Sequence, residues 1–216
     1  MTHPLWPLFD LVIQTERLEL RLPTDDELVA LADVARAGIH EPDEMPFTVA
    51  WSTAPSPQFE QGFAQHHWAM RGTWDADDWM LNLGVFLDGS AIGSQSVMAR
   101  DMAVYRTIRT GSWLGRSFQG RGMGKEMRAG ILSFAFDHLG AVRADTEAFL
   151  DNARSTGVSR ALGYVEDGLG QLAPQGVARP TQRFRITVAE WRARPRDAAE
   201  VIGLDGCREM FGIAAR

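Results

Sequence analysis

A glycine-rich segment near the middle of the chain constrains the fold more than any other feature. Residues 119–125 read Gln-Gly-Arg-Gly-Met-Gly-Lys, after an apolar stretch that ends at Leu114. Apolar residues then recur at helical spacing, which predicts a strand, a tight turn and an amphipathic helix. Glycines let a backbone approach a ligand closely, and a helix N-terminus attracts anions. The segment therefore predicts a phosphate-binding turn, surrounded by the cations Arg116, Arg121, Lys125 and Arg128.

The spacing of the glycines excludes two common phosphate loops. A P-loop ending at Gly124-Lys125 needs glycine at position 119 and Ser or Thr at 126, where this chain has Gln119 and Glu126. A dinucleotide-binding fingerprint needs a third glycine three residues after a Gly-x-Gly pair, and Lys125 or Met127 stands there instead. What remains is a Gln-x-x-Gly-x-Gly pattern, or a plain glycine-rich turn that only ends a strand.

The first half of the chain predicts helices followed by a meander of strands. Period-two alternation predicts a strand at 18–22, and the pair Thr24 and Glu27 is typical of a capping box that begins a helix. A loop at 38–51 leads to a second helix after Pro57. Apolar runs at 79–87, 91–99 and about 106–114 predict three antiparallel strands, with a hairpin turn at Asp88-Gly89.

The second half predicts a strand–loop–helix–strand–helix unit. After the helix that begins near Met123, a strand is predicted at 142–150 and a helix from Asp151-Asn152 to Leu162, ended by Gly163. A late strand is predicted at 183–188, and the tail from Asp197 has no clear pattern. The order of elements predicts a mixed α/β fold.

Composition narrows the class of protein. A chain of 216 residues can form one domain, 1–216. Its net charge of -6 argues against a nucleic-acid partner, and no apolar run is long enough for a membrane span. The single cysteine, Cys207, favours a reducing, cytoplasmic location. No histidine or cysteine spacing fits a metal site, since the adjacent His66 and His67 would diverge on a helix.

With these residues in hand, the chain resembles the GNAT acetyltransferases, and their RimJ/RimL-like branch in particular. The resemblance covers most of the chain and rests on an ordered set of motifs: residues 15–18 (Thr-Glu-Arg-Leu), 91–93 (Ala-Ile-Gly), 119–124 (Gln-Gly-Arg-Gly-Met-Gly), 152–155 (Asn-Ala-Arg-Ser) and 162–164 (Leu-Gly-Tyr). It implies the GNAT fold, a central twisted mixed sheet flanked by helices, with 195–216 as a C-terminal extension. The segments 6–10 (Trp-Pro-Leu-Phe-Asp) and 45–47 (Met-Pro-Phe) are similar to those of a subgroup that uses succinyl-CoA.

The resemblance also implies roles for individual residues. The donor would be acetyl-CoA or succinyl-CoA, with its pyrophosphate on the loop residues Gln119, Gly120, Arg121, Gly122, Met123, Gly124 and Lys125. Backbone groups of Trp113, Leu114 and Gly115 would align the pantetheine arm and the acyl carbonyl. Asn152 would hydrogen-bond the pantetheine, and Ser155 would protonate the departing thiolate. An amine would attack directly in a ternary complex, and a backbone N–H would stabilise the oxyanion that forms.

The general base and the acceptor stay open at this stage. His40, Glu41, Glu44 and Asp78 are candidate bases, and His40 could instead be an exposed loop histidine. The acidic residues near 41–44 and 75–78 are candidates for attracting a cationic amine. A small molecule, a peptide or a protein could be the acceptor. A coenzyme A-binding protein without catalysis is the alternative, and the resemblance favours a homo-oligomer.

Overall fold

The computed structural model describes residues 3–195 and 198–213, and a mixed sheet lies at its centre. Within these residues the sheet has nine strands in the order β7-β8-β6-β5-β4-β3-β2-β1-β9. Every neighbouring pair is antiparallel except β5 and β6. The strands are β1 (Val12–Gln14), β2 (Leu18–Arg21), β3 (Asp78–Leu87), β4 (Ser90–Arg100), β5 (Thr107–Leu114), β6 (Arg143–Phe149), β7 (Val165–Leu172), β8 (Arg179–Thr187) and β9 (Glu200–Ile202).

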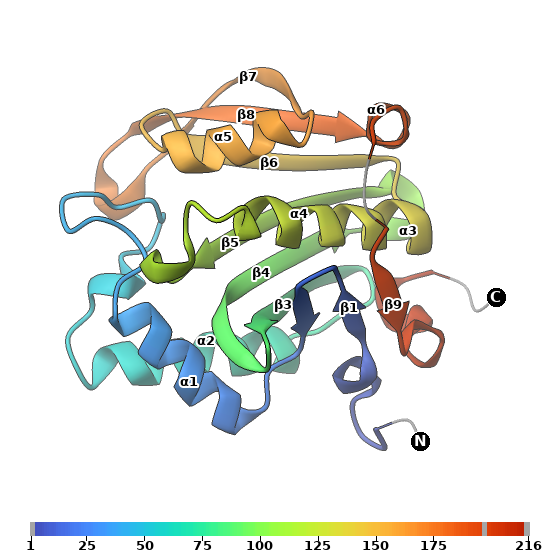
Figure 1. Ribbon diagram of the computed structural model, residues 1–216, viewed down its shortest axis with the longest axis horizontal. Helices are drawn as coiled ribbons and strands as arrows, with labels where there is room; N and C mark the ends of the chain where they lie inside the picture. Colours follow the sequence, from blue (N-terminus) through green and yellow to red (C-terminus); the bar gives the residue numbers. More distant parts are fainter. Residues whose placement is uncertain (1–2, 196–197, 214–216) are drawn as a thin grey trace.

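Helices cover both faces of this sheet, so the predicted α/β fold is confirmed (Figure 1). The helices are α1 (Asp25–Arg36), α2 (Gln58–Gly72), α3 (Met102–Tyr105), α4 (Met123–Ser133), α5 (Ala153–Ala161) and α6 (Val188–Arg192). Helices α1 and α2 pack on the face that carries Ala91 and Trp113. Helices α4 and α5 lie on the opposite face, in front of the sheet in Figure 1. Among the described residues, none of the helices has the length and apolar character of a membrane span.

Local sequence signals explain where α1 begins. The Thr24 hydroxyl accepts a hydrogen bond from the Glu27 N–H, and the Glu27 carboxylate accepts one from the Thr24 N–H at 2.8 Å. This reciprocal capping box was predicted from the sequence and is confirmed. Arg21 donates two further hydrogen bonds to Glu27, and these lower the pKa of Glu27 to about 2. The start of α1 is therefore tied to the end of β2.

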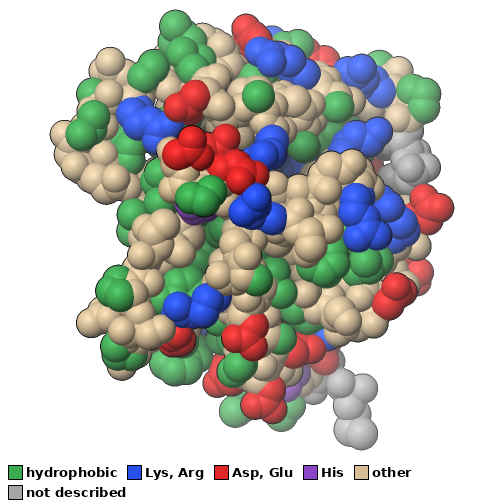
Figure 2. Space-filling view, turned by 60° about the vertical axis from the view of Figure 1, so that its left-hand side comes forward, with side chains coloured by type: hydrophobic (Ala, Val, Ile, Leu, Met, Phe, Trp, Pro, Cys, Tyr) green, Lys and Arg blue, Asp and Glu red, His purple; other side chains and the backbone are tan. Residues whose placement is uncertain are grey.

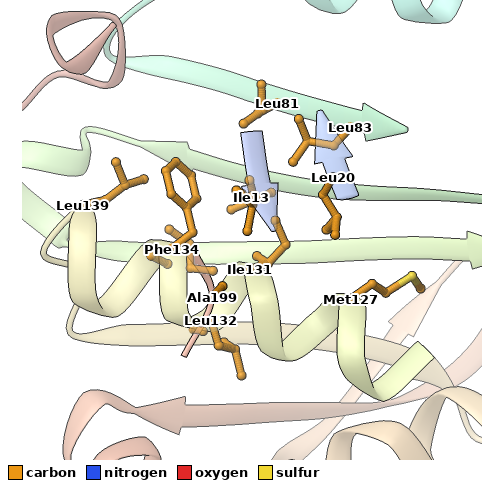
Figure 3. Packing of buried hydrophobic residues seen from close by; sticks show 14 of the residues in the cluster. Ile13, Leu20, Leu81, Leu83, Met127, Ile131, Leu132, Phe134, Leu139 and Ala199 are labelled. Atoms are coloured by element: carbon orange, nitrogen blue, oxygen red, sulfur yellow. The ribbon is translucent and has the colours of Figure 1, made fainter. Parts of the chain in front are cut away.

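Helix α4 supplies much of the core. Met127 and Ile131 of α4, and Phe134 in the π-helical turn that follows it, point toward Ile13, Leu20 and Leu81 on the strands (Figure 3). Ile131 and Phe134 are fully buried, and burying a side chain of this size stabilises a fold by about 1.5–3 kcal/mol. This packing fixes the first turn of α4, and with it the glycine-rich loop, against the sheet.

The sheet is divided between β5 and β6. These parallel strands are paired only from Thr107–Arg143 to Arg109–Asp145. Beyond that point β5 continues to Leu114 against β4, and β6 continues to Phe149 against β8. Residues 110–114 and 146–149 therefore line a split, which opens toward the glycine-rich loop after β5.

The structure also contains elements that the sequence patterns did not predict. β1 and β9 are three residues each, too short for a periodic signal, and β7 is a polar outer strand with little burial. The late strand is longer than predicted, and Val188 begins α6 rather than ending that strand. The segment 195–216 is not a loose extension in its described part. β9 pairs with β1, and Leu204 and Phe211 belong to the main core.

Candidate active site

The glycine-rich loop has the geometry of an anion-binding turn. Gly120 has a φ of 72° and Gly122 a φ of 82°, a conformation that L-residues with a side chain rarely adopt. Gly122 is the N-cap of α4. A Cβ on Gly124 would lie 3.7 Å from Leu114 and from Val158, so this glycine sits between β5 and α5. The two left-handed glycines turn the chain sharply from β5 into α4.

Several backbone N–H groups of this loop are free to bind a ligand. Within the described chain, no backbone hydrogen bond is found for the N–H groups of residues 120–122. Those of Met123 and Gly124 belong to the first turn of α4, where N–H groups have no intrahelical partner. The N–H groups of Gln119 and Lys125 instead donate to Arg116 and Gly122. The N–H groups that are free to bind a ligand are therefore those of residues 120–124. This is a narrower set than residues 119–125, which were predicted to bind the pyrophosphate.

Glu126 fixes the loop to the N-terminal part of the sheet. Its carboxylate accepts hydrogen bonds from the Thr15 hydroxyl at 2.7 Å, the Arg17 N–H at 2.9 Å and the Arg17 Nε at 2.7 Å. Burial disfavours the charged form, but these hydrogen bonds outweigh burial and lower the pKa of Glu126. Arg17 also contacts the carbonyl of Arg121. The loop is thus held from behind by an ionised carboxylate and its partners.

A segment that we call the strap, residues 37–50, crosses in front of the loop. Arg116 N–H donates to the Gly38 carbonyl at 2.9 Å, and the Gln119 side chain donates to the Ile39 and Leu114 carbonyls at 2.8 Å. At its other end, the Arg179 guanidinium donates to the Met45 carbonyl. The strap therefore joins the end of β5 to the β6–β8 side of the split.

A cavity of about 500 Å³ lies between the strap and the loop. Its lining residues are Ala37, Glu41, Arg116, Gln119, Gly120 and Arg154. Glu41 pairs with Arg116 at 2.7 Å and with Arg154 at 3.4 Å, and Glu44 pairs with Arg154 at 3.3 Å. Figure 2 shows acidic and basic side chains gathered side by side on this face of the molecule. The cavity thus carries both charges beside the free N–H groups.

Helix α5 brings Asn152 and Ser155 toward the same region. The Asn152 side-chain oxygen accepts a hydrogen bond from the Ser155 N–H at 3.0 Å, so Asn152 caps this helix. The cap leaves the Asn152 amide N–H₂ for another partner. Val158 of α5 faces Gly124 of the loop, and Arg154 lines the cavity. The structure therefore brings α5, the helix of the predicted residues, next to the predicted loop.

At the end of β5, some backbone groups are already used. Gly115 N–H donates to Ile92 at 2.9 Å on the β4 side, and the Leu114 carbonyl accepts from Gln119. Because N–H groups alternate sides along a strand, the Leu114 N–H faces the split while those of Trp113 and Gly115 face β4. Of these three predicted residues, Leu114 is the one with an N–H directed to the split.

The candidate bases lie in different surroundings, Glu41 being the one that lines the cavity. His40 is buried rather than an exposed loop histidine: its Nδ1 lies 2.7 Å from the Glu41 carbonyl and its Nε2 lies 2.8 Å from the Ser52 hydroxyl. Glu44 is exposed on the strap beside Arg154. Asp78 pairs with Arg100 at the far end of β3 and β4, roughly 20 Å along β4 from Gly93, which pairs with Leu114. The structure does not bring Asp78 together with the others.

An aromatic wall stands on the α1–α2 side of the strap. Trp51 lies 5.8 Å from Trp113 between ring centroids, 5.2 Å from Phe47 and 5.8 Å from Phe63. His40 packs edge-on against Phe47 at 5.9 Å. Phe59 stacks behind Trp51. The wall positions the strap and gives that side of the site an apolar surface.

The sequence predicted Arg128 as one of the cations around the glycine-rich loop, but the structure buries it behind the split. Its guanidinium, 3 % exposed, donates to the Ser112 hydroxyl of β5 at 3.1 Å and contacts the Thr146 hydroxyl of β6 at 3.4 Å. Its Nε has no hydrogen-bond partner, and among the described residues no carboxylate pairs with it. The sequence gave its place on the helix after the loop, but not its contacts with the two strands. No group of three metal-ligating side chains was found within 3–195 and 198–213.

Comparisons with known proteins identify the family of this chain. The family model described as "Acetyltransferase (GNAT) domain" matches residues 17–165, which include the loop, the strap and α5. The chain therefore belongs to the GNAT acetyltransferase family, as its motifs predicted.

Individual relatives have low sequence identity to this chain. The chain is 26% identical over 113 residues to the "Putative ribosomal N-acetyltransferase YdaF" of Bacillus subtilis (strain 168), a match that spans 51% of this chain and 61% of that protein. Its fold is similar to Mycobacterium smegmatis RimJ in complex with CoA-disulfide, with a TM-score of 0.70, 19% identity, and coverage of 89% of this chain and 98% of that one. For the ribosomal L7/L12 alpha-N-protein acetyltransferase RimL in complex with coenzyme A, the TM-score is 0.66 and the identity 16%, with coverage of 82% of this chain and 97% of that one.

Proposed function

We propose that this chain, acting as a single domain, transfers an acyl group from coenzyme A to an amine. The observation that carries the proposal is the set of free N–H groups at residues 120–124, at the positive end of α4 and beside the split between β5 and β6. Such a turn suits a pyrophosphate, and the split can admit an extended arm as a further strand-like element. Family membership supports the same reading.

Each part of the donor has a matching group in this arrangement. The free N–H groups of residues 120–124 would hold the pyrophosphate, with Gln119 and Lys125 shaping the loop. The pantetheine would run along the split beside the free amide N–H₂ of Asn152. The Leu114 N–H, which faces the split, would donate to the thioester carbonyl as it becomes an oxyanion. One such donor typically contributes a factor of about 10²–10³ to the rate.

The proton transfers fall to α5 and the strap. Ser155 lies on the first turn of α5, next to the cavity-lining Arg154, and would protonate the departing thiolate. The attacking amine must lose a proton, and the candidate bases Glu41 and Glu44 both lie on the strap beside Arg154. His40 would act by holding the strap, since both of its ring nitrogens are engaged.

The acceptor is proposed to be a protein or peptide amine. This rests on the descriptions of two similar proteins, a "Putative ribosomal N-acetyltransferase" and a "Ribosomal L7/L12 alpha-N-protein acetyltransferase". A small-molecule amine is the competing class. The aromatic wall of Trp51 and Trp113 and the acidic strap would receive a cationic amine with an apolar neighbour.

We propose acetyl-CoA as the acyl donor. The unpaired charge of Arg128 supports succinyl-CoA as a second candidate. A buried guanidinium without a carboxylate partner is costly. A carboxylate at the end of an acyl chain in the split would meet Arg128 between Ser112 and Thr146. A succinyl donor would therefore offset a charge that an acetyl donor leaves unpaired.

Calorimetric titration with acetyl-CoA, succinyl-CoA and free CoA tests these proposals. A Gly122→Trp variant should lose binding, because residue 122 needs a positive φ and a bulky side chain would cover the free N–H groups. Gly62→Trp is the control, since Gly62 is exposed on α2 with open space around it. Absence of binding by the wild type would refute the function, and binding without transfer to any amine would favour a non-catalytic coenzyme A-binding protein.

The same titrations distinguish acetyl-CoA from succinyl-CoA as the acyl donor. Tighter binding of succinyl-CoA that Arg128→Met abolishes would assign the succinyl donor, and equal binding of both thioesters would leave acetyl-CoA. We also propose a homo-oligomer, which light scattering would refute by showing only monomer.

A further inference from the structure

The charged groups around the cavity form ion pairs with one another. Arg116 follows β5 and Arg154 lies on α5, so the two arginines stand on opposite sides of the split. Glu41 reaches between them from the strap and pairs with both, at 2.7 Å and 3.4 Å. One carboxylate therefore occupies the position in which two guanidinium groups converge.

We propose that Arg116 and Arg154 form a phosphate-binding site for the donor and that Glu41 masks this site until a phosphate displaces it. The inference rests on the proposed function, because the phosphate is that of a coenzyme A thioester. Gly120, whose N–H is free, lines the same cavity as both arginines and Glu41. A phosphate held by the loop would thus lie in one compartment with the two guanidinium groups.

The exchange of partners is favourable on physical grounds. The side chains of Arg116, Glu41 and Arg154 are 45%, 36% and 57% exposed, and ion pairs at such positions are weak and screened by salt. A phosphate presents more charge and more acceptor oxygens than a carboxylate, and guanidinium groups bind it with two parallel hydrogen bonds. The phosphate is therefore expected to displace the Glu41 carboxylate from both arginines.

Displacement has a consequence for the strap. Once Arg116 and Arg154 are bound to phosphate, Glu41 and Glu44 lose their cationic partners while the strap stays tied through Gly38, Ile39 and Met45. The two carboxylates then face the cavity unpaired, and such a pair attracts a cationic amine. Donor binding would thereby prepare the acceptor side of the site.

Calorimetric titration of coenzyme A into wild type, Glu41→Gln and Asp43→Asn tests the masking. Asp43 lies on the same strap, and no ion pair of Asp43 is found among the described residues, so Asp43→Asn makes the same change of charge without freeing an arginine. We expect Glu41→Gln to tighten coenzyme A binding by roughly three- to tenfold, as removal of two weak pairs implies, and Asp43→Asn to have a clearly smaller effect.

Dephospho-coenzyme A identifies the phosphate concerned. If Glu41→Gln tightens coenzyme A but not dephospho-coenzyme A, the arginines bind the 3′-phosphate; if it tightens both, they bind the pyrophosphate. Weaker binding by Glu41→Gln, or the same change in both variants, would overturn the masking while wild-type binding still upheld the proposed function. Failure of the wild type to bind coenzyme A would instead refute the function itself.

Discussion

His67 predicts a loss of stability in mild acid. Its imidazole, 3 % exposed, lies on α2 against the Phe63 ring at 5.0 Å, with Nδ1 3.5 Å from the Asn82 side-chain amide. Burial, together with the charges of the neighbouring His66 and Arg71, lowers the pKa of His67 from 6.5 to about 3. The folded protein therefore keeps this ring neutral at a pH at which the unfolded chain protonates it.

The size of the effect follows from these two pKa values. A group with a depressed pKa in the folded state stabilises the fold above its unfolded pKa, and that contribution is lost as the pH falls from 6.5 toward 3. At pH 5 the unfolded chain gains about 2 kcal/mol from protonating this one residue, while the folded protein gains almost nothing. The free energy of unfolding should fall by that amount between pH 7.5 and pH 5.

Urea unfolding followed by tryptophan fluorescence at both pH values measures this loss. His67→Gln should reduce the loss by about 2 kcal/mol, whereas His66→Gln, which changes an exposed neighbour, should retain most of it. An equal acid-induced loss in wild type and His67→Gln would refute the reasoning. So would an NMR titration that places the pKa of His67 near 6.5.

Two further substitutions test how the glycine-rich loop is held and how the C-terminal segment packs. Glu126→Gln should destabilise the protein by about 1–3 kcal/mol in urea unfolding, because it weakens the charge-assisted hydrogen bonds from Thr15 and Arg17. Glu16→Gln, which changes an exposed residue, is the control. Because the pKa of Glu126 is lowered in the folded protein, the difference in stability from wild type should shrink as the pH falls through that pKa. Gly203→Ala should lower the melting temperature more than Gly176→Ala does: both glycines have a φ of 78°, but only at 203 would a Cβ meet the Asp10 carbonyl, at 2.0 Å.

The parts of the fold that the sequence predicted are those with strong local signals. The capping box at Thr24, the hairpin at Asp88-Gly89 and the helix-ending Gly163 each depend on residues within a few positions of one another. β1 and β9 escaped prediction because their pairing joins the two ends of the chain, and three residues are too few to show a period. Their existence depends on tertiary contacts.

The same division holds for the candidate site. The glycine-rich loop could be predicted because its conformation depends on the positive φ angles of Gly120 and Gly122 themselves. The pairing of Glu41 with Arg116 and Arg154 joins residues 75 and 113 positions apart. No local pattern reports a contact of that kind, which exists only because the strap folds back over the split.

The position of the site follows from where two strands stop pairing. β5 and β6 are parallel, so a connection must carry the chain from the end of β5 back to the start of β6, and here it consists of the glycine-rich loop and α4. That connection begins at the same end at which the two strands diverge, so the free N–H groups of residues 120–124 necessarily lie at the mouth of the split. Arg128, on the second turn of α4, contacts both strands where they separate, through Ser112 and Thr146. One helix therefore places an anion-binding turn at the entrance of the split and a buried cation behind it, and a donor with charge at both ends would use both.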